Sequence, residues 1–324
     1  MTDQQRQWLR KANLVVASST GNGLDLSQMH FKFKIRQSDE EMPNTADIRV
    51  YNLSADTVKA ITGKSPVEYS RVVVQGGYEQ GVYGVIFDGT IKQFRLGHES
   101  ATSTYLDILA AAGDPEYNFG AINQTLSQAD AATIAEKTAT QMGLKLAPLP
   151  DRAGTPGLSF GGTLPRGKVL WGMGRSSLRS LAASQGWSWS IQDGQVTMIP
   201  LDGYLPTEAV VLNSSSGMIG FPEQTDQGIK VRCLLNPKLK IGTRAQIDNK
   251  SINQTIAQAS NAIPVGQLPF DQRAGLTLLA DVSNDGEYFI YVVEHAGNTR
   301  GQEWYSDLIC LAIDRSTGKV KPYG

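Results

Sequence analysis

The chain has 324 residues, a length typical of about two domains that each bury their own core. Its 30 Lys and Arg residues balance 31 Asp and Glu residues, so the chain as a whole has no excess of charge with which to bind nucleic acid or an anionic membrane. Charged residues at 19% and 33 glycines are typical of a turn-rich β protein that hides surface against partners.

The N-terminal stretch contains an apolar run too short for a signal peptide, and no window approaches the ~20 apolar residues of a membrane span. We therefore expect a protein that is made and folded in the cytoplasm, without membrane insertion. Cys233 and Cys310 lie in apolar, strand-like runs, and neither belongs to a CxxC pair. This setting predicts two buried, reduced thiols.

The first third of the chain reads as short strands. In residues 29–36 apolar side chains alternate with cationic ones, which predicts a half-buried strand, and residues 47–53 repeat the pattern. Ser54 is placed to cap a short helix over 54–62. Further strands are expected at 70–76, 85–96 and 102–111, and this spacing predicts a closed or nearly closed β-barrel over residues 1–112.

The middle third, residues 113–216, is predicted to be a small α+β region. Residues 127–143 are rich in Ala and end at a glycine that suits a helix C-terminus, and residues 175–186 indicate a second helix. Residues 187–200 predict a hairpin that turns on Asp193-Gly194.

Strand patterns return in the last third, residues 217–324, for which we predict a second β-barrel. Pro and Gly residues of the segment 217–242 mark places where strand pairing must stop, since Pro cannot donate to a ladder and Gly permits turns. The alternation of GIKVRCLL sends Ile229, Val231 and Cys233 into a core and Lys230 and Arg232 outward. The fold class is thus mainly β, with two barrels that flank an α/β insert.

The segment Gly162–Val169, GTLPRGKV, has the spacing of a phosphate-binding loop up to its lysine. Val169 stands where a Ser or Thr hydroxyl would hold magnesium, and Pro165 removes one backbone N–H from a phosphate cradle. A flexible loop is the better interpretation, and we expect no nucleotide or other cofactor.

Other catalytic or binding groups are dispersed. The three histidines form no HExxH or HxH motif, and we expect a solvated His30 and a turn-stabilising His295 rather than metal ligands. The carboxylate pairs Asp114/Glu116 and Glu294/Glu303 have the residue types that cleave glycosidic bonds, but solvated turn residues are the simpler interpretation. Trp187 and Trp189 share one strand face and suit either a core or a sugar-stacking platform.

Four segments in order resemble the baseplate hub proteins of bacteriophage tails. GMIGFPEQTDQGIKVRCLLNPKLKIG is similar to the family's Gly-x-Pro-Glu turn and Leu-Asn-Pro strand end, and GEYFIYVVEHAGNTRGQEWYSDLICLA to its closing hairpin with His295, Arg300-Gly301 and Trp304. MPNTADIRVYNLS resembles a first-barrel strand, and the helix at 127–143 followed by WSWSIQDGQVTMIP resembles the middle region.

The resemblance implies a structural protein without enzymatic activity. Three copies, each with two similar barrels, would present six near-equivalent units to the hexameric tail tube and seat the central spike at the other end. The implied partners are a homotrimer of the chain, the tube protein, the spike and further baseplate proteins such as the tape measure, with DNA as passing cargo. The implied location is the virion tail, assembled in the host cytoplasm; a contractile injection apparatus is a related setting.

We expect an exposed edge strand at 29–36 to pair or pack against a neighbouring subunit, because an unpaired edge otherwise promotes aggregation. The candidate interface residues are Lys32, Lys34, Arg36, Lys230, Arg232 and Trp304. Two other classes of function stay open from the sequence: a virion-associated enzyme that degrades cell wall, and a glycan-binding tail protein.

Overall fold

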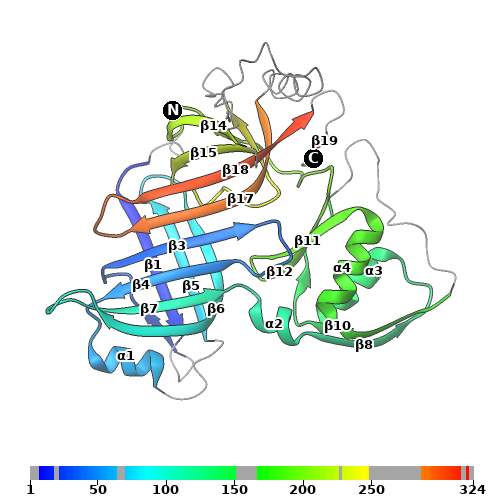
Figure 1. The fold of residues 1–324 in the computed structure, drawn as a ribbon, viewed down its shortest axis with the longest axis horizontal. Helices are drawn as coiled ribbons and strands as arrows, with labels where there is room; N and C mark the ends of the chain where they lie inside the picture. Colours follow the sequence, from blue (N-terminus) through cyan, green and yellow to red (C-terminus); the bar gives the residue numbers. More distant parts are fainter. Residues whose placement is uncertain are drawn as a thin grey trace, which may run out of the picture.

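The structure, a computed structural model, describes residues 7–17, 22–63, 70–150, 166–225, 228–247, 286–314 and 319–320. The chain is mainly β, as the sequence predicts, and the helices gather in the middle region and at one short connection. Figure 1 shows the strands of the first and last regions as one broad stack, with the middle region beside it.

The N-terminal region contributes seven strands and one helix. Alternating apolar residues give its strands a buried face, and Ser54 accepts a hydrogen bond from the Thr57 N–H at 3.1 Å, which confirms the predicted helix cap. Its elements are β1 (Arg10–Ala17), β2 (Gly23–Asp25), β3 (Phe31–Ser38), β4 (Thr45–Tyr51), α1 (Ala55–Thr62), β5 (Arg71–Tyr78), β6 (Tyr83–His98) and β7 (Thr104–Ala111).

The middle region packs helices α3 and α4 against two small sheets, one of β8 and β10 and one of β11, β12 and β9. The predicted hairpin turn at Asp193-Gly194 is present, with positive φ at both residues. The elements are α2 (Asp114–Phe119), β8 (Ala121–Leu126), α3 (Ala131–Gln141), β9 (Lys145–Leu146), β10 (Lys168–Met173), α4 (Gly174–Gln185), β11 (Trp187–Gln192) and β12 (Gln195–Pro200).

The C-terminal region returns to the large sheet. Its buried residues come from alternate positions of β15, β17 and β18, as the pattern around Ile229 and Val231 predicts. Its elements are β13 (Val210–Leu212), β14 (Met218–Thr225), β15 (Gly228–Leu234), β16 (Arg244–Ile247), β17 (Glu287–Asn298), β18 (Trp304–Asp314) and β19 (Lys319–Val320). The sequence LTLLADVS, residues 276–283, also has the composition of a strand, and it lies outside the described residues.

Strands from the two ends of the chain form a single 14-stranded sheet. Its main path runs β14-β15-β18-β17-β3-β4-β7-β6-β5-β1-β2, and β13, β16 and β19 pair at its side. In Figure 1 strands β1, β5 and β6 pass behind β3 and β4, so the sheet curls over the N-terminal core. The two closed barrels that we expected are not shown: among the described residues the first and last regions share one continuous sheet.

The continuity of the sheet rests on the antiparallel pairing of β3 with β17. Lys32 to Ser38 lie opposite Asn298 to Val292 in an unbroken register. β3 also pairs with β4 on its other side. The prediction that residues 29–36 form an edge strand is therefore wrong, because a distant part of the chain supplies the second partner.

A close approach of backbone and ring marks this junction. Gly297 is buried on β17, and a Cβ atom there would overlap the ring of Phe33, which lies opposite it on β3. Phe33 in turn meets Trp304 edge-on, with ring centroids 5.6 Å apart. A residue without a side chain at position 297 thus lets two distant segments of the core interlock.

We predict that Gly297→Val lowers the free energy of unfolding by about 1–3 kcal/mol, because the added methyl groups overpack the Phe33 ring. Urea denaturation at a fixed protein concentration measures the effect. Ala296→Val is the matched control: its side chain points to the opposite, partly exposed face of the same strand. Equal effects of the two substitutions would contradict the proposed close packing.

Candidate assembly surface

One face of the large sheet carries a group of charged side chains, and the N-terminal core and the core around Ile229 and Val231 lie on the opposite face. Strands β3, β4, β6, β7, β15, β17 and β18 all contribute outward side chains to a shallow hollow on this face. We call it the charged face, defined by Lys32, Lys34, Asp47, Arg49, Arg95, Asp107, Arg232, Glu294, Glu303 and Asp307. Acidic and basic residues alternate across it.

Two arginine–aspartate pairs on this face have the same geometry. Arg49 on β4 donates from Nε and Nη2 to the Asp107 carboxylate on β7, at 2.6 and 3.0 Å. Arg232 on β15 donates in the same way to Asp307 on β18, at 2.6 and 2.9 Å. A planar guanidinium that binds both oxygens of a carboxylate has its position fixed.

A tyrosine two residues before each aspartate completes the arrangement. The Arg49 guanidinium lies 3.9 Å from the Tyr105 ring centroid, and that of Arg232 lies 4.3 Å from the Tyr305 centroid. These distances suit cation–π stacking. The sequences YLDIL (105–109) and YSDLI (305–309) therefore carry one structural motif in two places.

Hydrogen bonding controls the charge of these groups. Burial tends to raise the pKa of Asp107, but hydrogen bonds from Arg49 and Arg95 outweigh it and hold that pKa below its usual value. The hydrogen bond to Asp307 raises the pKa of Arg232. Asp107 and Arg232 therefore stay ionised at neutral pH.

The motif belongs to a larger internal repeat. We call β3, β4, β5, β6 and β7 the first unit and β14, β15, β16, β17 and β18 the second unit. The sheet order within them is β3-β4-β7-β6-β5 and β14-β15-β18-β17, with β16 paired to β17 as β5 is to β6. Each unit therefore has the same strand order.

A bulge at the same place supports the equivalence of the two units. The ladder of β6 with β7 shifts register between Ile91 and Gln93, and that of β17 with β18 shifts between Ile290 and Val292. Their partners are Ala110 and Leu109 in one unit and Cys310 and Ile309 in the other. Counting from the aspartates, the two ladders align residue for residue.

Three of the predicted interface residues lie at the junction of the two units. Arg36 donates to Glu294 at 2.9 Å, and Lys34 lies 3.8 Å from the same carboxylate. Lys32 lies 5.2 Å from the Tyr51 ring centroid. Lys34 and Arg36 thus form ion pairs within the chain, while their outer surfaces remain exposed.

The other three predicted residues separate into two environments. Lys230 and Arg232 are exposed on β15, as predicted. Trp304 is 2% exposed and packs in the N-terminal core, under the Arg10 guanidinium at 5.8 Å. The prediction that Trp304 lies at a partner surface is therefore wrong, because its side chain fills the core where the two units meet.

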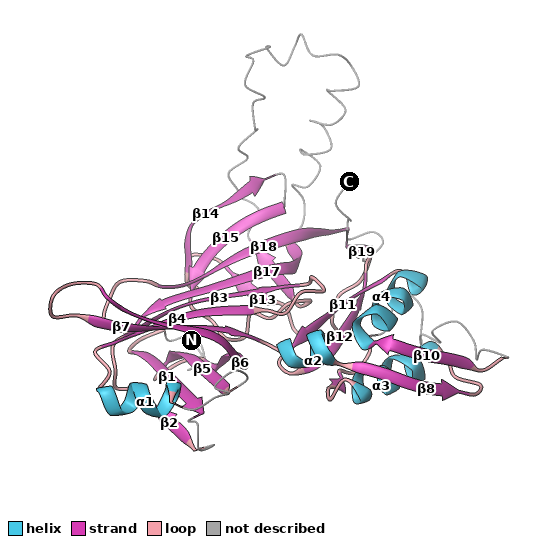
Figure 2. Cartoon of the chain, turned by 60° about the horizontal axis from the view of Figure 1, so that its bottom comes forward, coloured by secondary structure: helices cyan, strands magenta, loops and turns pink. Residues whose placement is uncertain are grey.

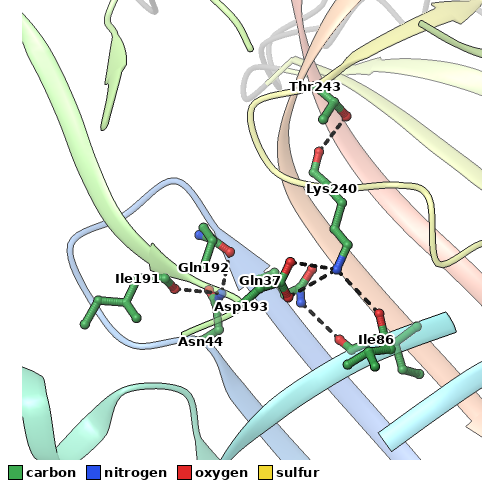
Figure 3. Close-up of polar contacts among 9 residues, drawn as sticks. Gln37, Asn44, Ile86, Ile191, Gln192, Asp193, Lys240 and Thr243 are labelled. Carbon is green, nitrogen blue, oxygen red and sulfur yellow. Dashed lines mark hydrogen bonds and ion pairs between the residues drawn. The ribbon is translucent and has the colours of Figure 1, made fainter. Parts of the chain in front are cut away.

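A polar cluster joins the middle region to the sheet, as Figure 3 shows. The buried Asn44 amide donates to the Gln192 side chain at 2.7 Å and to the Ile191 carbonyl at 3.3 Å. Gln192 donates in turn to the Ser38 carbonyl at 2.9 Å. These bonds hold the end of β11 against the β3–β4 connection.

Lys240, from the C-terminal region, completes the cluster. Its ammonium donates to both carboxylate oxygens of Asp193, at 2.9 and 3.1 Å, and to the Val85 carbonyl at 3.4 Å. Next to it Gln37 donates to the Ile86 carbonyl at 3.0 Å (Figure 3). All three regions of the chain therefore meet here.

Asp39 is a second link between the sheet and the middle region. Its carboxylate accepts hydrogen bonds from Ser188 at 2.8 Å and Ser190 at 3.5 Å, both on β11. Burial raises the pKa of Asp39 to about 7, although the two hydroxyls favour the ionised form.

The residue types that suggested chemistry in the sequence take structural roles. Trp187 and Trp189 are buried in the core of the middle region, which confirms the core interpretation over a sugar platform. His295 is buried and bonded to the Ser306 hydroxyl at 2.8 Å, and burial lowers its pKa to about 3, so the ring is neutral. His30 bonds to Asn298 at 2.8 Å.

The carboxylates and thiols are held similarly. Asp114 is buried and forms an ion pair with Lys92 at 2.9 Å, while Glu294 binds the cations of β3. Cys233 and Cys310 are free and buried, as predicted, and burial raises the pKa of Cys233 to about 12. In the segment Gly162–Val169, which has the partial spacing of a phosphate-binding loop, Lys168 and Val169 begin β10. Residues 162–165 lie outside the described residues.

Within the described ranges, no group of His, Cys, Asp and Glu is arranged to hold a metal ion. None of the helices described has the length and apolar character needed to cross a membrane.

Comparison with protein families gives a match over most of the chain. A family model described as "Baseplate hub gp41" matches residues 14–263. The chain belongs to this family of baseplate hub proteins. The match places the chain among components of the phage tail. No curated protein matches the sequence.

Solved structures show the same fold at low sequence identity. The 43 kDa tail protein of prophage MuSo2 from Shewanella oneidensis aligns with a TM-score of 0.57 at 10% identity, over 94% of this chain and 98% of that one. A tail protein from Neisseria meningitidis MC58 gives 0.56 at 10%, over 95% and 98%. The E. coli c3393 protein, a component of the type VI secretion system, gives 0.52 at 10%, over 91% and 76%.

We predict a pH-dependent contribution of Asp39 to stability. Its folded pKa lies above the unfolded value, so the contribution is complete below about pH 4 and is lost as pH rises through about 7. In the wild-type protein this should lower the free energy of unfolding by about 1–4 kcal/mol between these pH values. Asp39→Asn should abolish that decrease. Denaturation series between pH 4.5 and 8 measure it.

Asp56→Asn, at an exposed carboxylate of α1, is the control and should keep the wild-type slope. If Asp39→Asn and wild type lose stability in parallel as pH rises, the raised pKa of Asp39 is contradicted.

Proposed function

We propose that the chain is the structural hub of a phage tail baseplate, and that three copies join a sixfold tail tube to a central spike. Membership of the baseplate hub family supports the structural role. In this proposal the protein has no enzymatic activity. Tube, spike and tape-measure proteins are its partners, DNA is passing cargo, and assembly takes place in the host cytoplasm.

The internal repeat is the observation that carries the trimeric proposal. The two units share a strand order, a bulge and an Arg–Asp–Tyr cluster, and they lie side by side in one sheet (Figure 1). A chain with two similar units gives six units in a closed ring of three. In that arrangement a ring of three chains offers six similar units to a sixfold tube, while the ring itself keeps the threefold symmetry of a central spike.

The boundaries of the repeat also bear on domain organisation. We propose that residues 1–112 and 217–324 act as the two tube-like parts and that residues 113–216 are an insert between them. The insert has its own core around Trp187 and Trp189 and lies beside the sheet (Figure 2). Such a placement leaves the charged face of the sheet uncovered by the insert.

The proposal predicts a closed trimer. Native mass spectrometry of the purified chain, alone and with its tube protein, should give a species of three times the 35.1 kDa chain mass. Negative-stain images should show rings with six similar lobes. A protein that stays monomeric or forms only dimers under both conditions would contradict the proposal.

A further inference from the structure

A groove lies between the end of β12 and strands β17 and β18, where the middle region meets the sheet (Figure 1). Its volume is about 460 Å³, within the range of about 300–1,000 Å³ that is typical of ligand sites. We call it the β12–β18 groove, defined by Asp39, Glu40, Leu201, Tyr291, Val292 and Leu311.

We propose that the β12–β18 groove binds an extended segment of a partner protein that carries an apolar side chain beside a Lys or Arg. The apolar side chain packs against Leu201 and Leu311, and the cation binds to Asp39 and Glu40. This inference goes beyond the proposed hub function, because the groove is complete in one copy of the chain.

One end of the groove is apolar. Leu201 is 60% exposed there, and Leu311 is partly exposed on β18. Val292 and Val320 lie buried at the base, so the wall continues into the core of the protein. An apolar side chain that enters this end covers both leucines and is itself removed from water, which favours binding.

Backbone hydrogen bonds hold the walls of the groove in place. The Leu201 N–H donates to the carbonyl of Gly186, at the end of α4, at 3.0 Å. The Val320 N–H donates to the Asp202 carbonyl at 3.0 Å, and the Asp202 carboxylate pairs with Lys319 at 2.9 Å. The segment after β12 is thus fixed to both α4 and β19. A preformed groove lowers the entropic cost of binding.

The other end of the groove has an excess of negative charge. Asp39 and Glu40 line it, while Arg36, the cation of the same groove, is already bound to Glu294 at 2.9 Å. Glu40 is exposed, and within the described part of the chain it forms no ion pair. Charge complementarity therefore favours a cationic group at this end.

Asp39 has acceptor capacity left for such a cation. Its carboxylate accepts hydrogen bonds from the Ser188 and Ser190 hydroxyls of β11, and the two oxygens of a carboxylate accept about four hydrogen bonds in all. Burial raises the pKa of Asp39 to about 7, and the nearby charge of Glu40 adds to the shift. A cation bound here would stabilise the ionised form of Asp39.

The remaining titratable groups of the groove leave this role to Asp39 and Glu40. Arg36 on β3 has its charge balanced by Glu294. Burial and the two carboxylates raise the pKa of Tyr291 on β17, so its phenol stays neutral.

The shape of the surface favours a chain segment over a compact small molecule. A second hollow of about 320 Å³ shares Val292 and Ile309 with the groove and continues along the sheet to Glu294 and Asp307. The two hollows form one elongated track. Lys and Arg suit its acidic end because each has an apolar stem and a charged tip.

Peptide binding tests the site. The probe is the peptide acetyl-Gly-Val-Leu-Lys-Gly-amide, titrated to millimolar concentration against the isotope-labelled full chain and followed by NMR of the backbone amides. Binding should shift the amides of Leu201, Tyr291 and Val292. The same peptide with norleucine in place of Lys keeps the stem and loses the charge, and should bind about tenfold or more weakly.

Two substitutions test the acidic end. Asp39→Asn and Glu40→Gln should each weaken binding of the Lys peptide by about three- to tenfold and leave binding of the norleucine peptide unchanged. Glu136→Gln, at an exposed carboxylate of α3, is the matched control and should bind both peptides as wild type does. A Lys peptide that binds to Asp39→Asn and Glu40→Gln as tightly as to wild type would overturn the proposal.

The pH dependence of binding distinguishes a direct contact with Asp39 from a general effect of charge. A cation binds more tightly to ionised Asp39, so the affinity for the Lys peptide should rise by up to about tenfold from pH 6 to pH 8. Asp39→Asn should abolish this rise, whereas Glu40→Gln should keep it. Equal affinity of the wild-type chain at both pH values would overturn the proposal.

An absence of amide shifts around the groove at millimolar Lys peptide would also overturn it. The hub function is tested separately, since a trimer in native mass spectrometry would support that function whether or not the groove binds the peptide.

Discussion

The antiparallel pairing of β3 with β17 is the interaction on which the rest of the structure depends. It joins segments about 260 positions apart, as the Arg36–Glu294 contact illustrates. Without it β3 and β17 would each have an open edge, and the cores around Phe33 and His295 would be exposed. Because of it the two β units form one sheet, in which β3 of the first unit and β17 of the second unit are neighbours.

Energetics favour the backbone ladder and the core over the surface charges in holding this junction. Exposed ion pairs contribute about 0.2–1 kcal/mol each, less than the burial of one large apolar side chain, about 1.5–3 kcal/mol. The pairs on the charged face therefore act mainly on the register of the strands.

Local features of the fold were predictable from the sequence. The alternation in β3, the cap at Ser54 and the turn at Asp193-Gly194 each depend on residues a few positions apart, and all three are present. The strand pairings that define the sheet were not predictable in this way. An alternating pattern shows that a strand has a buried face, but it does not identify the strand that pairs with it.

The same limit explains the errors at the candidate surface. The second partner of residues 29–36 is β17, near the other end of the chain. Because the pattern of residues 29–36 gives no sign of that partner, the sequence alone predicts an edge strand. The sequence around Trp304 does not show that Phe33, which lies far away in the chain, covers its ring. A prediction from neighbouring residues therefore places Trp304 at a partner surface. One signal was visible in the sequence: Tyr-x-Asp occurs at 105–107 and at 305–307, each after an earlier strand that contains Arg49 or Arg232. Reading that spacing as a repeat would have indicated two equivalent units.

Hydrogen exchange of the backbone amides tests most directly whether the pairing of β3 with β17 holds the two units in one sheet. The account predicts that the amides of Val292–Asn298 exchange as slowly as those of the ladder between β3 and β4. Fast exchange of the Val292–Asn298 amides beside a protected ladder of β3 with β4 would contradict it.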